Sequence, residues 1–368
     1  MKIDGRAYRT IWPAADGWSI EVIDQTKLPH EFATLRLTSL EQAAHAIRAM
    51  QVRGAPLIGV TAAYGVALAM REDASDEHLV RALALLAATR PTAVNLHWAL
   101  QAMKAALRNL APRERVAAAY VKASEICEED VVINRAIGEQ ALGLFRAAFA
   151  RKGGKQPLKI LTHCNAGWLA CVDWGTALAP IYLAHDAGMP LHIWVDETRP
   201  RNQGALTAWE LKSHGVPHQV IVDNAGGHLM RAGEVDLCIV GTDRVAANGD
   251  VANKIGTYLK ALAAKDNGVP FYVALPSPTI DWALPSGDGI PIEQRAEDEV
   301  TSISGRAADG SLTAVAPYPA GTRAANFGFD VTPARLVTAL ITERGVAQAS
   351  HQGLLSLYPE MAAAAAMD

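Results

Sequence analysis

The 368-residue sequence has few cysteines, no excess of charge of one sign and no long apolar run. Its four cysteines form no CxxC pair, which argues against zinc and disulfide frameworks and favours a reducing compartment. With a net charge of -4, the sequence lacks the excess of basic residues that is typical of nucleic-acid-binding proteins. No apolar run approaches the ~18–20 residues needed to cross a bilayer, and Met1–Arg6 lacks the pattern of a signal peptide. We therefore expect a cytoplasmic protein that binds neither nucleic acid nor membrane.

Signatures of cofactors and metals are also missing. The loop after the first strand of the C-terminal half contains no GxGxxG, so a dinucleotide site lacks its main signature. None of the histidines has a ligand partner three to five residues further along an evident helix, and His163 is most simply structural. The sequence predicts no cofactor and no metal.

The length exceeds the usual size of a single core, so two domains are expected. Residues 1–150 form the first, with short alternating strands up to about residue 30 and then helices. These helices are expected over about 58–70, 76–88, 94–108 and 112–149. The polar stretch Arg151–Pro157, with two glycines and a proline, marks the boundary.

Strands alternate with helices in residues 151–368, which is typical of βαβ units and a parallel sheet. The strands are expected at 158–162, 191–195, 218–222, 237–240 and 271–274, with helices over about 175–187, 205–214 and 227–231 and one ending near 265. Thr332 and Pro333 are expected to begin a later helix. The predicted fold class is α/β: a small, mostly helical N-terminal domain and a Rossmann-like C-terminal domain.

Asp243 follows the apolar run Leu237–Val240, where the carboxyl end of a strand opens into a crevice. Further along, Asn253 is expected to cap a helix that continues through Lys254, and phosphates favour helix N-termini. This stretch would bring a carboxylate, an amide and an amine to one pocket. An ion pair between Asp243 and Arg199 or Arg201 is the simpler alternative.

Three other residues could contribute chemistry. Cys164 follows the strand 158–162 and could act as nucleophile, acid or base, although a buried inert cysteine is the commoner case. Arg53 and Arg90 lie beside turns before helices, where arginine can bind phosphate, but a solvated or ion-paired surface arginine is the commoner case for each.

Ten segments, in order along nearly the whole chain, together resemble one known family. They are Val52–Pro56, Arg90–Leu96, Thr162–Gly167, Asp196–Pro200, Gln203–Ala205, Leu206–Leu211, Gly241–Arg244, Ala247–Tyr258, Pro270–Ala274 and Ile290–Arg295. The chain resembles the methylthioribose-1-phosphate isomerases. Their superfamily also contains the regulatory subunits of translation initiation factor 2B and ribose-1,5-bisphosphate isomerase.

The resemblance implies a homodimer that converts 5-methylthioribose 1-phosphate to 5-methylthioribulose 1-phosphate in methionine salvage, without a cofactor. Matched by motif, Cys164 and Asp243 would be the catalytic pair, with Asp243 the proton donor. The matching substrate-binding positions are Arg53, Gly54, Ala55, Arg90, Gln203, Asn253 and Lys254.

Some residues depart from the family pattern. Thr242 stands where alanine is common, and Trp168, Cys171 and Trp174 are bulky where small residues are expected. These changes put the 5-substituent of the substrate in doubt, so 5-deoxyribose 1-phosphate and ribose 1,5-bisphosphate remain alternatives. Apolar tryptophans speak against a second phosphate. A non-catalytic sugar-phosphate- or nucleotide-sensing subunit is the rival from another class, but it would not need the pair Cys164 and Asp243.

Overall fold

The computed structural model describes residues 1–3, 5–90 and 93–364. Its N-terminal part contains short strands followed by helices, as predicted. The strands are β1 (Lys2–Ile3), β2 (Arg6–Ala7), β3 (Ile11–Pro13), β4 (Ile20–Ile23) and β5 (Thr34–Leu37), and β3-β4-β5 form an antiparallel sheet. The helices are α1 (Leu40–Arg48), α2 (Ala55–Glu72), α3 (Asp76–Ala87), α4 (Val94–Leu107) and α5 (Pro112–Arg151). Pro91 and Thr92 of the family motif lie outside the described residues.

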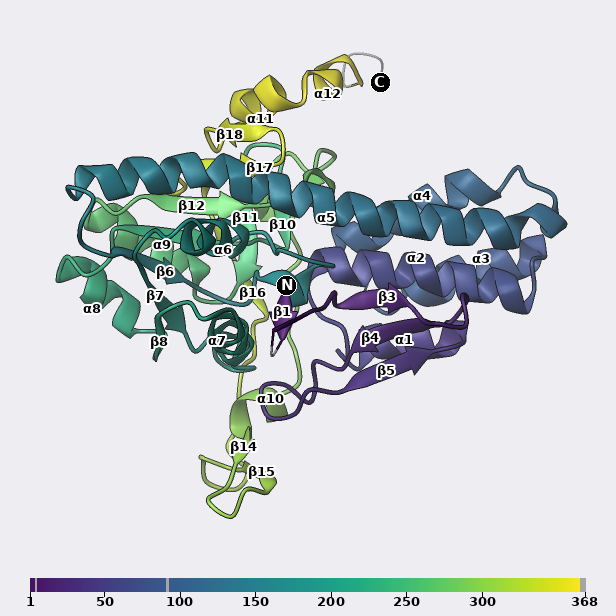
Figure 1. Cartoon of the computed structure of the whole chain (residues 1–368), viewed down its shortest axis with the longest axis horizontal. Coiled ribbons are helices and arrows are strands. Elements are labelled where there is room, and N and C mark those ends of the chain that lie inside the picture. The colour runs from purple at the N-terminus through teal and green to yellow at the C-terminus, as the bar shows by residue number, and fades with distance from the viewer. Residues whose placement is uncertain (4, 91–92, 365–368) are drawn as a thin grey trace.

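Helix α2 is the centre of this part. It is apolar on all sides and buried from Leu57 to Met70, as a helix surrounded by other helices must be. Helix α5 is longer and runs beside both halves of the molecule (Figure 1). Its first half packs through Ala119 and Ile126 into the helical core, and its second half packs through Ile137 and Phe145 against the large sheet. The predicted boundary near residue 150 remains a prediction.

The C-terminal part is built on a seven-stranded sheet in the order β18-β17-β12-β9-β6-β7-β8, in which only the β17–β18 pair is antiparallel. The strands are β6 (Leu158–Thr162), β7 (Leu191–Asp196), β8 (His218–Ile221), β9 (Leu237–Val240), β12 (Phe271–Ala274), β17 (Ala339–Thr342) and β18 (Gly345–Ala347). The five strands expected from the sequence are confirmed, as is the α/β fold class.

Alternate residues of these strands face two different cores. Ile160 and Ile239 face the core shared with α5, α6 (Ala179–Asp186) and α7 (Gln203–His214). Leu161 and Val240 face the core shared with α8 (Ala225–Arg231), α9 (Thr257–Asp266) and α11 (His351–Leu357). The sheet is therefore covered by helices on both faces, which explains its continuous apolar strands.

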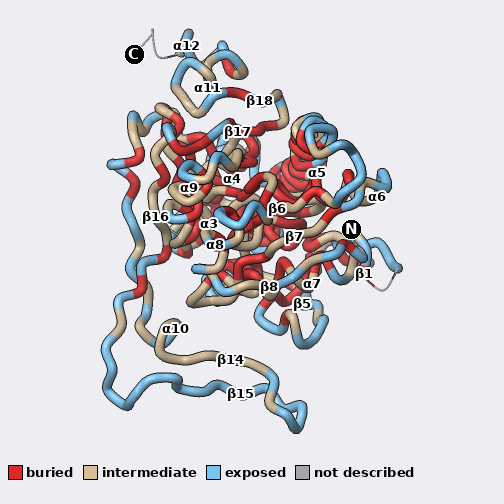
Figure 2. Tube along the Cα trace, turned by 90° about the vertical axis from the view of Figure 1, so that its left-hand side faces the viewer, coloured by how far each residue is buried: buried red, intermediate tan, exposed pale blue. Residues whose placement is uncertain are grey.

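A smaller four-stranded sheet lies beside the carboxyl ends of the large one. Its order is β13 (Ile280–Asp281), β10 (Arg244–Ala246), β11 (Val251–Lys254) and β16 (Phe329–Thr332). The hairpin β14 (Ile303–Arg306) and β15 (Leu312–Val315) projects from the body and is largely exposed (Figures 1 and 2). The short helices are α10 (Asp298–Thr301) and α12 (Pro359–Ala364), with 3-10 turns at Trp168–Ala170, Ser277–Thr279, Gly287–Gly289 and Ala334–Leu336.

Two predicted helix starts are wrong. Asn253 caps no helix, because it lies inside β11, and α9 begins later, after Gly256. Thr332 ends strand β16, and only a 3-10 turn follows Pro333. In both places the strand pairs with its neighbour: β11 pairs with β10 and β16, and this long-range pairing overrides the local capping pattern.

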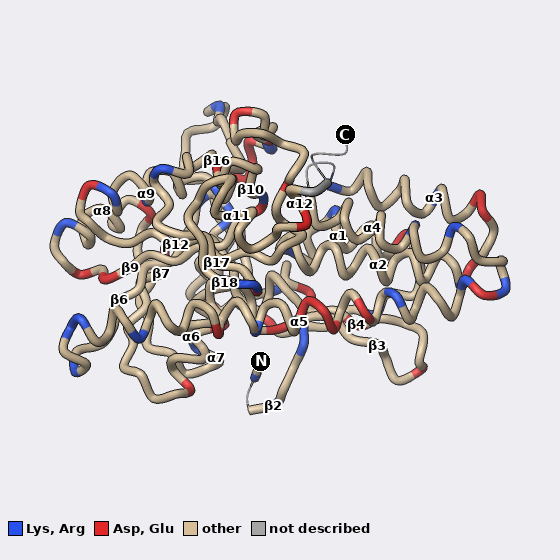
Figure 3. The backbone as a smooth tube through the Cα atoms, turned by 90° about the horizontal axis from the view of Figure 1, so that it is seen from above, with Lys and Arg blue, Asp and Glu red and all other residues tan. Residues whose placement is uncertain are grey.

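Charges of both signs occur at both ends of the molecule (Figure 3). Within the described residues, no helix combines the length and the apolar composition that crossing a membrane requires.

Candidate active site

One pocket opens where the order of the large sheet reverses. From β6 the chain proceeds to β7 and β8 on one side, and then returns to place β9 on the other side of β6. Ligands of open α/β sheets bind at this switch point, outside the carboxyl ends of the strands. Cys164 follows β6 and Asp243 follows β9, so both reach this position.

All nine site residues predicted from the sequence line this pocket. They are Arg53, Gly54, Ala55, Arg90, Cys164, Gln203, Asp243, Asn253 and Lys254. The pocket is enclosed by the start of α2 on one side and by the strand ends on the other. It therefore lies at the junction of the helical part and the sheet part of the molecule.

Cys164 is held by its backbone in an unusual conformation. Its φ of 68° lies in the left-handed region, which turns the chain sharply after β6. The Cys164 amide donates to Thr198 Oγ1 at 2.9 Å, and its carbonyl accepts from Thr207 Oγ1 at 3.0 Å. Burial raises the pKa of the Cys164 thiol, and the nearby Lys254 ammonium opposes that rise. The free enzyme therefore holds a largely neutral thiol.

Asp243 is a partly buried carboxyl group among cations. Burial raises its pKa, whereas Lys254, Arg90 and Arg295 favour the ionised form and limit the rise. The alternative ion pair with an arginine of the 199–201 loop is not the one observed, since Arg201 pairs with Glu299 at 2.6 Å. The raised pKa agrees in direction with a proton donor.

Two cations line the pocket, the half-buried Arg53 and the buried Lys254, and among the residues that the structure describes neither forms a close ion pair with a carboxylate. Burial lowers the pKa of Arg53 to about 10 and lowers the pKa of Lys254. Lys254 Nζ donates to Gly328 O at 2.8 Å and lies 4.5 Å from the centre of the Phe329 ring. Buried cations of this kind favour an anionic ligand.

Arg295 also lines the pocket, although the sequence singled it out only as the end of a family motif. It lies 3.2 Å from Glu299, and burial lowers its pKa. Its position in a loop far along the chain gave no local signal. Only the tertiary structure brings it beside Arg53 and Asp243.

The start of α2 supplies the helix N-terminus that Asn253 does not. Gly54 is the N-cap residue with no side-chain cap, and Pro56 has no N–H, so the helix start can offer the amides of Ala55 and Leu57 to a ligand. A Cβ on Gly54 would lie 2.3 Å from Ala170 O, and its φ of 87° also favours glycine. The close approach of the two segments therefore depends on this glycine.

Gln203 and Asn253 present amides to the same pocket. Gln203 Oε1 is buried without a hydrogen-bond partner among the described residues, which leaves an acceptor for a substrate hydroxyl. Asn253 Nδ2 donates to Thr257 Oγ1 at 3.1 Å, so its side chain is already oriented.

The two bulky tryptophans do not form the far end of the pocket. Trp168 is buried in the core beside α7, with its ring centre 6.1 Å from that of Trp209. Trp174 lies beside Arg135 of α5. Of the three bulky residues, only Cys171 lines the pocket, so the tryptophans no longer bear on the 5-substituent.

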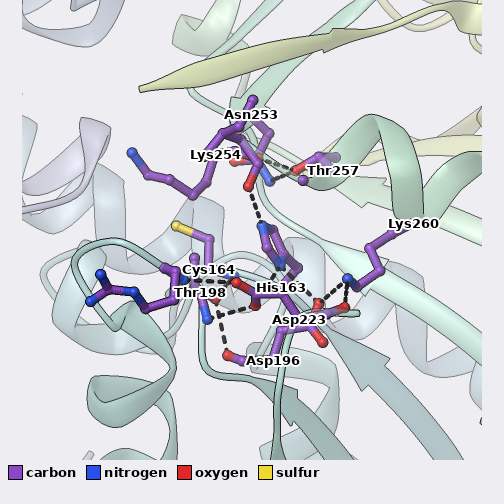
Figure 4. A network of polar contacts seen from close by, with 12 residues as sticks. His163, Cys164, Asp196, Thr198, Asp223, Asn253, Lys254, Thr257 and Lys260 are labelled. Atoms are coloured by element: carbon purple, nitrogen blue, oxygen red, sulfur yellow. Dashed lines mark hydrogen bonds and ion pairs between the residues drawn. The ribbon is translucent and has the colours of Figure 1, made fainter. Parts of the chain in front are cut away.

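Behind Cys164, a buried polar network joins several elements (Figure 4). The ligand atoms of His163, Asp196 and Asp223 lie within 4.8 Å of one another, as a metal site would require. However, Lys260 Nζ lies 3.1 Å from Asp196 Oδ2 and also donates to the Asp223 carbonyl. An ammonium group therefore already supplies a cation there, and we assign no metal.

Comparison with known proteins places the chain in a family. The model of the initiation factor 2 subunit family matches residues 51–349. A methylthioribose-1-phosphate isomerase of Rhodospirillum rubrum is 65% identical over 370 residues, which covers 99% of this chain and 95% of that protein. This chain belongs to the methylthioribose-1-phosphate isomerase family.

Two solved structures agree with this family in fold. The 5-methylthioribose 1-phosphate isomerase of Pyrococcus horikoshii OT3 has a TM-score of 0.83 and 37% identity, and the match covers 96% of each chain. A structure titled translation initiation factor eIF-2B, subunit delta, from A. fulgidus has a TM-score of 0.79 and 37% identity, covering 96% of this chain and all of that one. The fold is thus shared by proteins named as isomerases and as initiation-factor subunits, and the residues of the pocket must distinguish them.

Proposed function

We propose that this chain is an aldose–ketose isomerase that converts 5-methylthioribose 1-phosphate to 5-methylthioribulose 1-phosphate in methionine salvage. The observation that carries the proposal is the meeting of Asp243 and Cys164 in one buried pocket with Arg53 and Lys254. A pocket that only senses a sugar phosphate needs the cations but not the acid and the thiol.

The reaction requires three changes in the substrate. The bond between C1 and the ring oxygen breaks, and that oxygen gains a proton. One hydrogen moves from C2 to C1, and the C2 hydroxyl loses its proton as the ketone forms. Atoms and charge therefore balance without an external oxidant.

Asp243 is the proposed acid for ring opening. Burial raises its pKa, which increases the fraction of the protonated form that can donate to the ring oxygen. The same carboxylate can later accept the proton of the C2 hydroxyl. Nearby Lys254 opposes this rise in the pKa.

Cys164 is proposed to act on the hydrogen that moves between C2 and C1. It can take the hydrogen as a proton and return it, or it can border the path of a direct hydride shift. The raised pKa of the thiol weighs against the first route in the free enzyme. The two routes differ in a measurable way, because only a proton can exchange with solvent.

The phosphate is proposed to bind between Arg53, Lys254 and the free amides at the start of α2. Arg90 and Arg295 border the same space, while Gln203 and Asn253 are proposed to bind sugar hydroxyls. This assignment gives each of the predicted binding residues a contact that its chemistry can make.

The decisive experiment is an assay of a short panel of aldose 1-phosphates that differ only at C5. We expect 5-methylthioribose 1-phosphate to have the highest kcat/KM. Preference for 5-deoxyribose 1-phosphate or ribose 1,5-bisphosphate would identify a related isomerase, and no turnover of any of them would favour the sensing subunit. Deuterium at C2 then separates the routes: washout supports proton transfer, and full retention supports hydride transfer.

We also propose that the protein is a homodimer, as the family resemblance implies. The described surface carries apolar side chains that a partner could cover, among them Leu312 and Val315 on the projecting hairpin. Sedimentation equilibrium should give twice the chain mass of 39.2 kDa. A single-chain mass at micromolar concentration would contradict the dimer.

A further inference from the structure

His163 makes a contact with an acceptor at each of its two ring nitrogens. Nδ1 lies 2.8 Å from Asp196 Oδ2, and Nε2 lies 2.9 Å from the backbone carbonyl of Ile255 (Figure 4). A carbonyl oxygen can only accept, so Nε2 must carry a hydrogen. If Asp196 is ionised, Nδ1 must carry one as well, and the ring is an imidazolium.

Asp196 also forms an ion pair with Lys260. Its Oδ2 lies 3.1 Å from Lys260 Nζ, so the same carboxylate oxygen contacts both the ammonium and the ring. Both side chains of the His163–Asp196 pair are fully buried. A neutral imidazole would leave Nδ1 unable to donate, with an acceptor facing an acceptor in a buried site, which is costly.

Other charged groups face His163 from the neighbouring elements. Asp223 Oδ1, after β8, lies 3.9 Å from Nδ1, and Asp330 of β16 accepts from the Gly256 amide beside the ring. Lys260 of α9 is the opposing cation. The two carboxylates that lie closest to Nδ1, those of Asp196 and Asp223, outnumber the single ammonium, so a positive charge on the ring improves the balance.

This ring connects the two sides of the proposed catalytic pocket. His163 precedes Cys164, and Ile255 follows Lys254. On the first side, Asp196 O accepts from the Thr198 hydroxyl, which in turn accepts from the Cys164 amide. The His163 ring also packs closely against Gly256, since a Cβ at that position would lie 3.1 Å from His163 Cε1.

We propose that His163 is a positioning residue for the isomerisation: a buried imidazolium that donates from both ring nitrogens and so fixes the spacing between Cys164 and Lys254. This rests on the proposed function, which assigns the thiol and the ammonium to one substrate. Loss of the hydrogen bond to Asp196 or of the one to Ile255 would let the loop after β6 and the end of β11 move apart. A displacement of ~1 Å at reacting groups can lower a rate by about 100-fold.

The protonation state is tested on the wild-type full chain by NMR with 15N-labelled histidine. His163 can be assigned through the proximity of its ring to Gly256. We expect both ring nitrogens to be protonated at neutral pH, because each faces an acceptor. One unprotonated nitrogen at neutral pH would overturn the imidazolium.

The positioning role is tested with His163→Gln, and with His192→Gln as the matched control. His192 lies on β7 of the same sheet and does not line the pocket. We expect kcat of His163→Gln to fall by about 100-fold with a much smaller change in KM, and alkylation of Cys164 by iodoacetamide to change in rate. The control should match wild type in both.

Wild-type kcat in a folded His163→Gln protein would overturn the positioning role. If that variant fails to fold, the NMR measurement on the wild type still decides the imidazolium. If instead no sugar phosphate is turned over, the proposed function fails. The alkylation rate and the nitrogen signals nevertheless continue to report on His163, so the two failures are distinguishable.

Discussion

Two opposing influences act on the pKa of Asp243, and the same two act on the pKa of Cys164. Burial raises both pKa values, and the buried Lys254 ammonium opposes both rises. Burial thus shifts both groups towards their neutral forms in the free enzyme. A bound phosphate would neutralise part of the cationic charge and would favour those neutral forms further, so substrate binding itself prepares the acid.

For Asp243→Asn we expect kcat to fall by at least about 100-fold, because an amide cannot donate the proton that opens the ring. The wild-type acid acts in its protonated form, so kcat should fall as pH rises through the raised pKa. The residual kcat of the variant should not show this fall at alkaline pH. Rate–pH profiles with saturating substrate measure both.

Asp266→Asn is the matched control, since Asp266 is exposed at the end of α9. It should keep the wild-type profile. Near wild-type turnover by Asp243→Asn would remove this residue from the role of acid.

At the scale of elements, the start of α2 depends on the backbone of Gly54. Alanine there would meet Ala170 O at 2.3 Å and would have to adopt a φ of 87°. We expect Gly54→Ala to lose about 1–3 kcal/mol of stability and to raise KM, because the displaced helix start no longer faces the phosphate. Denaturant titration and steady-state kinetics measure the two effects.

Gly143→Ala provides the comparison. Gly143 lies within α5, and a Cβ there would have no atom within 4 Å. Alanine should leave KM unchanged and should stabilise the helix by up to about 1 kcal/mol. An unchanged KM in Gly54→Ala would show that the start of α2 does not bind the substrate.

Helix α5 carries a buried carboxyl group that makes stability depend on pH. Asp130 Oδ2 accepts from Val172 N at 2.7 Å, and burial raises the pKa of Asp130 from 3.8 to about 7. The folded chain thus retains a proton that the unfolded chain releases. Its contribution is fully present below about pH 4 and is lost as pH rises to about 7.

Asp130→Asn should remove this part of the pH dependence. Between about pH 4 and about pH 8, we expect the free energy of unfolding of the wild type to fall by up to about 4 kcal/mol more than that of the variant. Urea titrations at several pH values measure the difference. Glu125→Gln, at an exposed position on the same helix, should follow the wild type. Parallel curves for wild type and Asp130→Asn would contradict the raised pKa.

At the scale of the whole molecule, the pocket joins the helical part to the sheet part. Its walls come from the start of α2 and from the loops after β6 and β9. A ligand that contacts both parts should stabilise them together. Inorganic phosphate at about 100 times its own Kd should add about 2.7 kcal/mol to the free energy of unfolding.

Calorimetry with phosphate, compared with chloride at equal ionic strength, measures this effect. Arg53→Gln should weaken phosphate binding and so reduce the shift in Tm. Arg108→Gln should not, because Arg108 is exposed at the end of α4. A phosphate effect that persists in Arg53→Gln, at the same phosphate concentration, would place the anion elsewhere.

The helices and the parallel strands were predictable because their signals are local. Long helical patterns marked the four N-terminal helices α2 to α5, and short apolar runs marked β6, β7, β9 and β12. The two wrong helix starts, at Asn253 and Thr332, occur where strands of the small sheet pair across long distances in sequence. Local capping patterns carry no information about such pairing.

For the candidate site too, some residues were predictable from the sequence and others were identified only by the tertiary structure. Their places after parallel strands made Asp243 and Cys164 candidates, and the family motifs then implied the catalytic pair and the binding residues. Only the tertiary structure removed Trp168 from the pocket, added Arg295, and transferred the helix N-terminus from Asn253 to Gly54. It also placed both ring nitrogens of His163 against acceptors. Sequence determines which groups are available, whereas burial and the neighbours that set their charge states arise from the packing of distant segments.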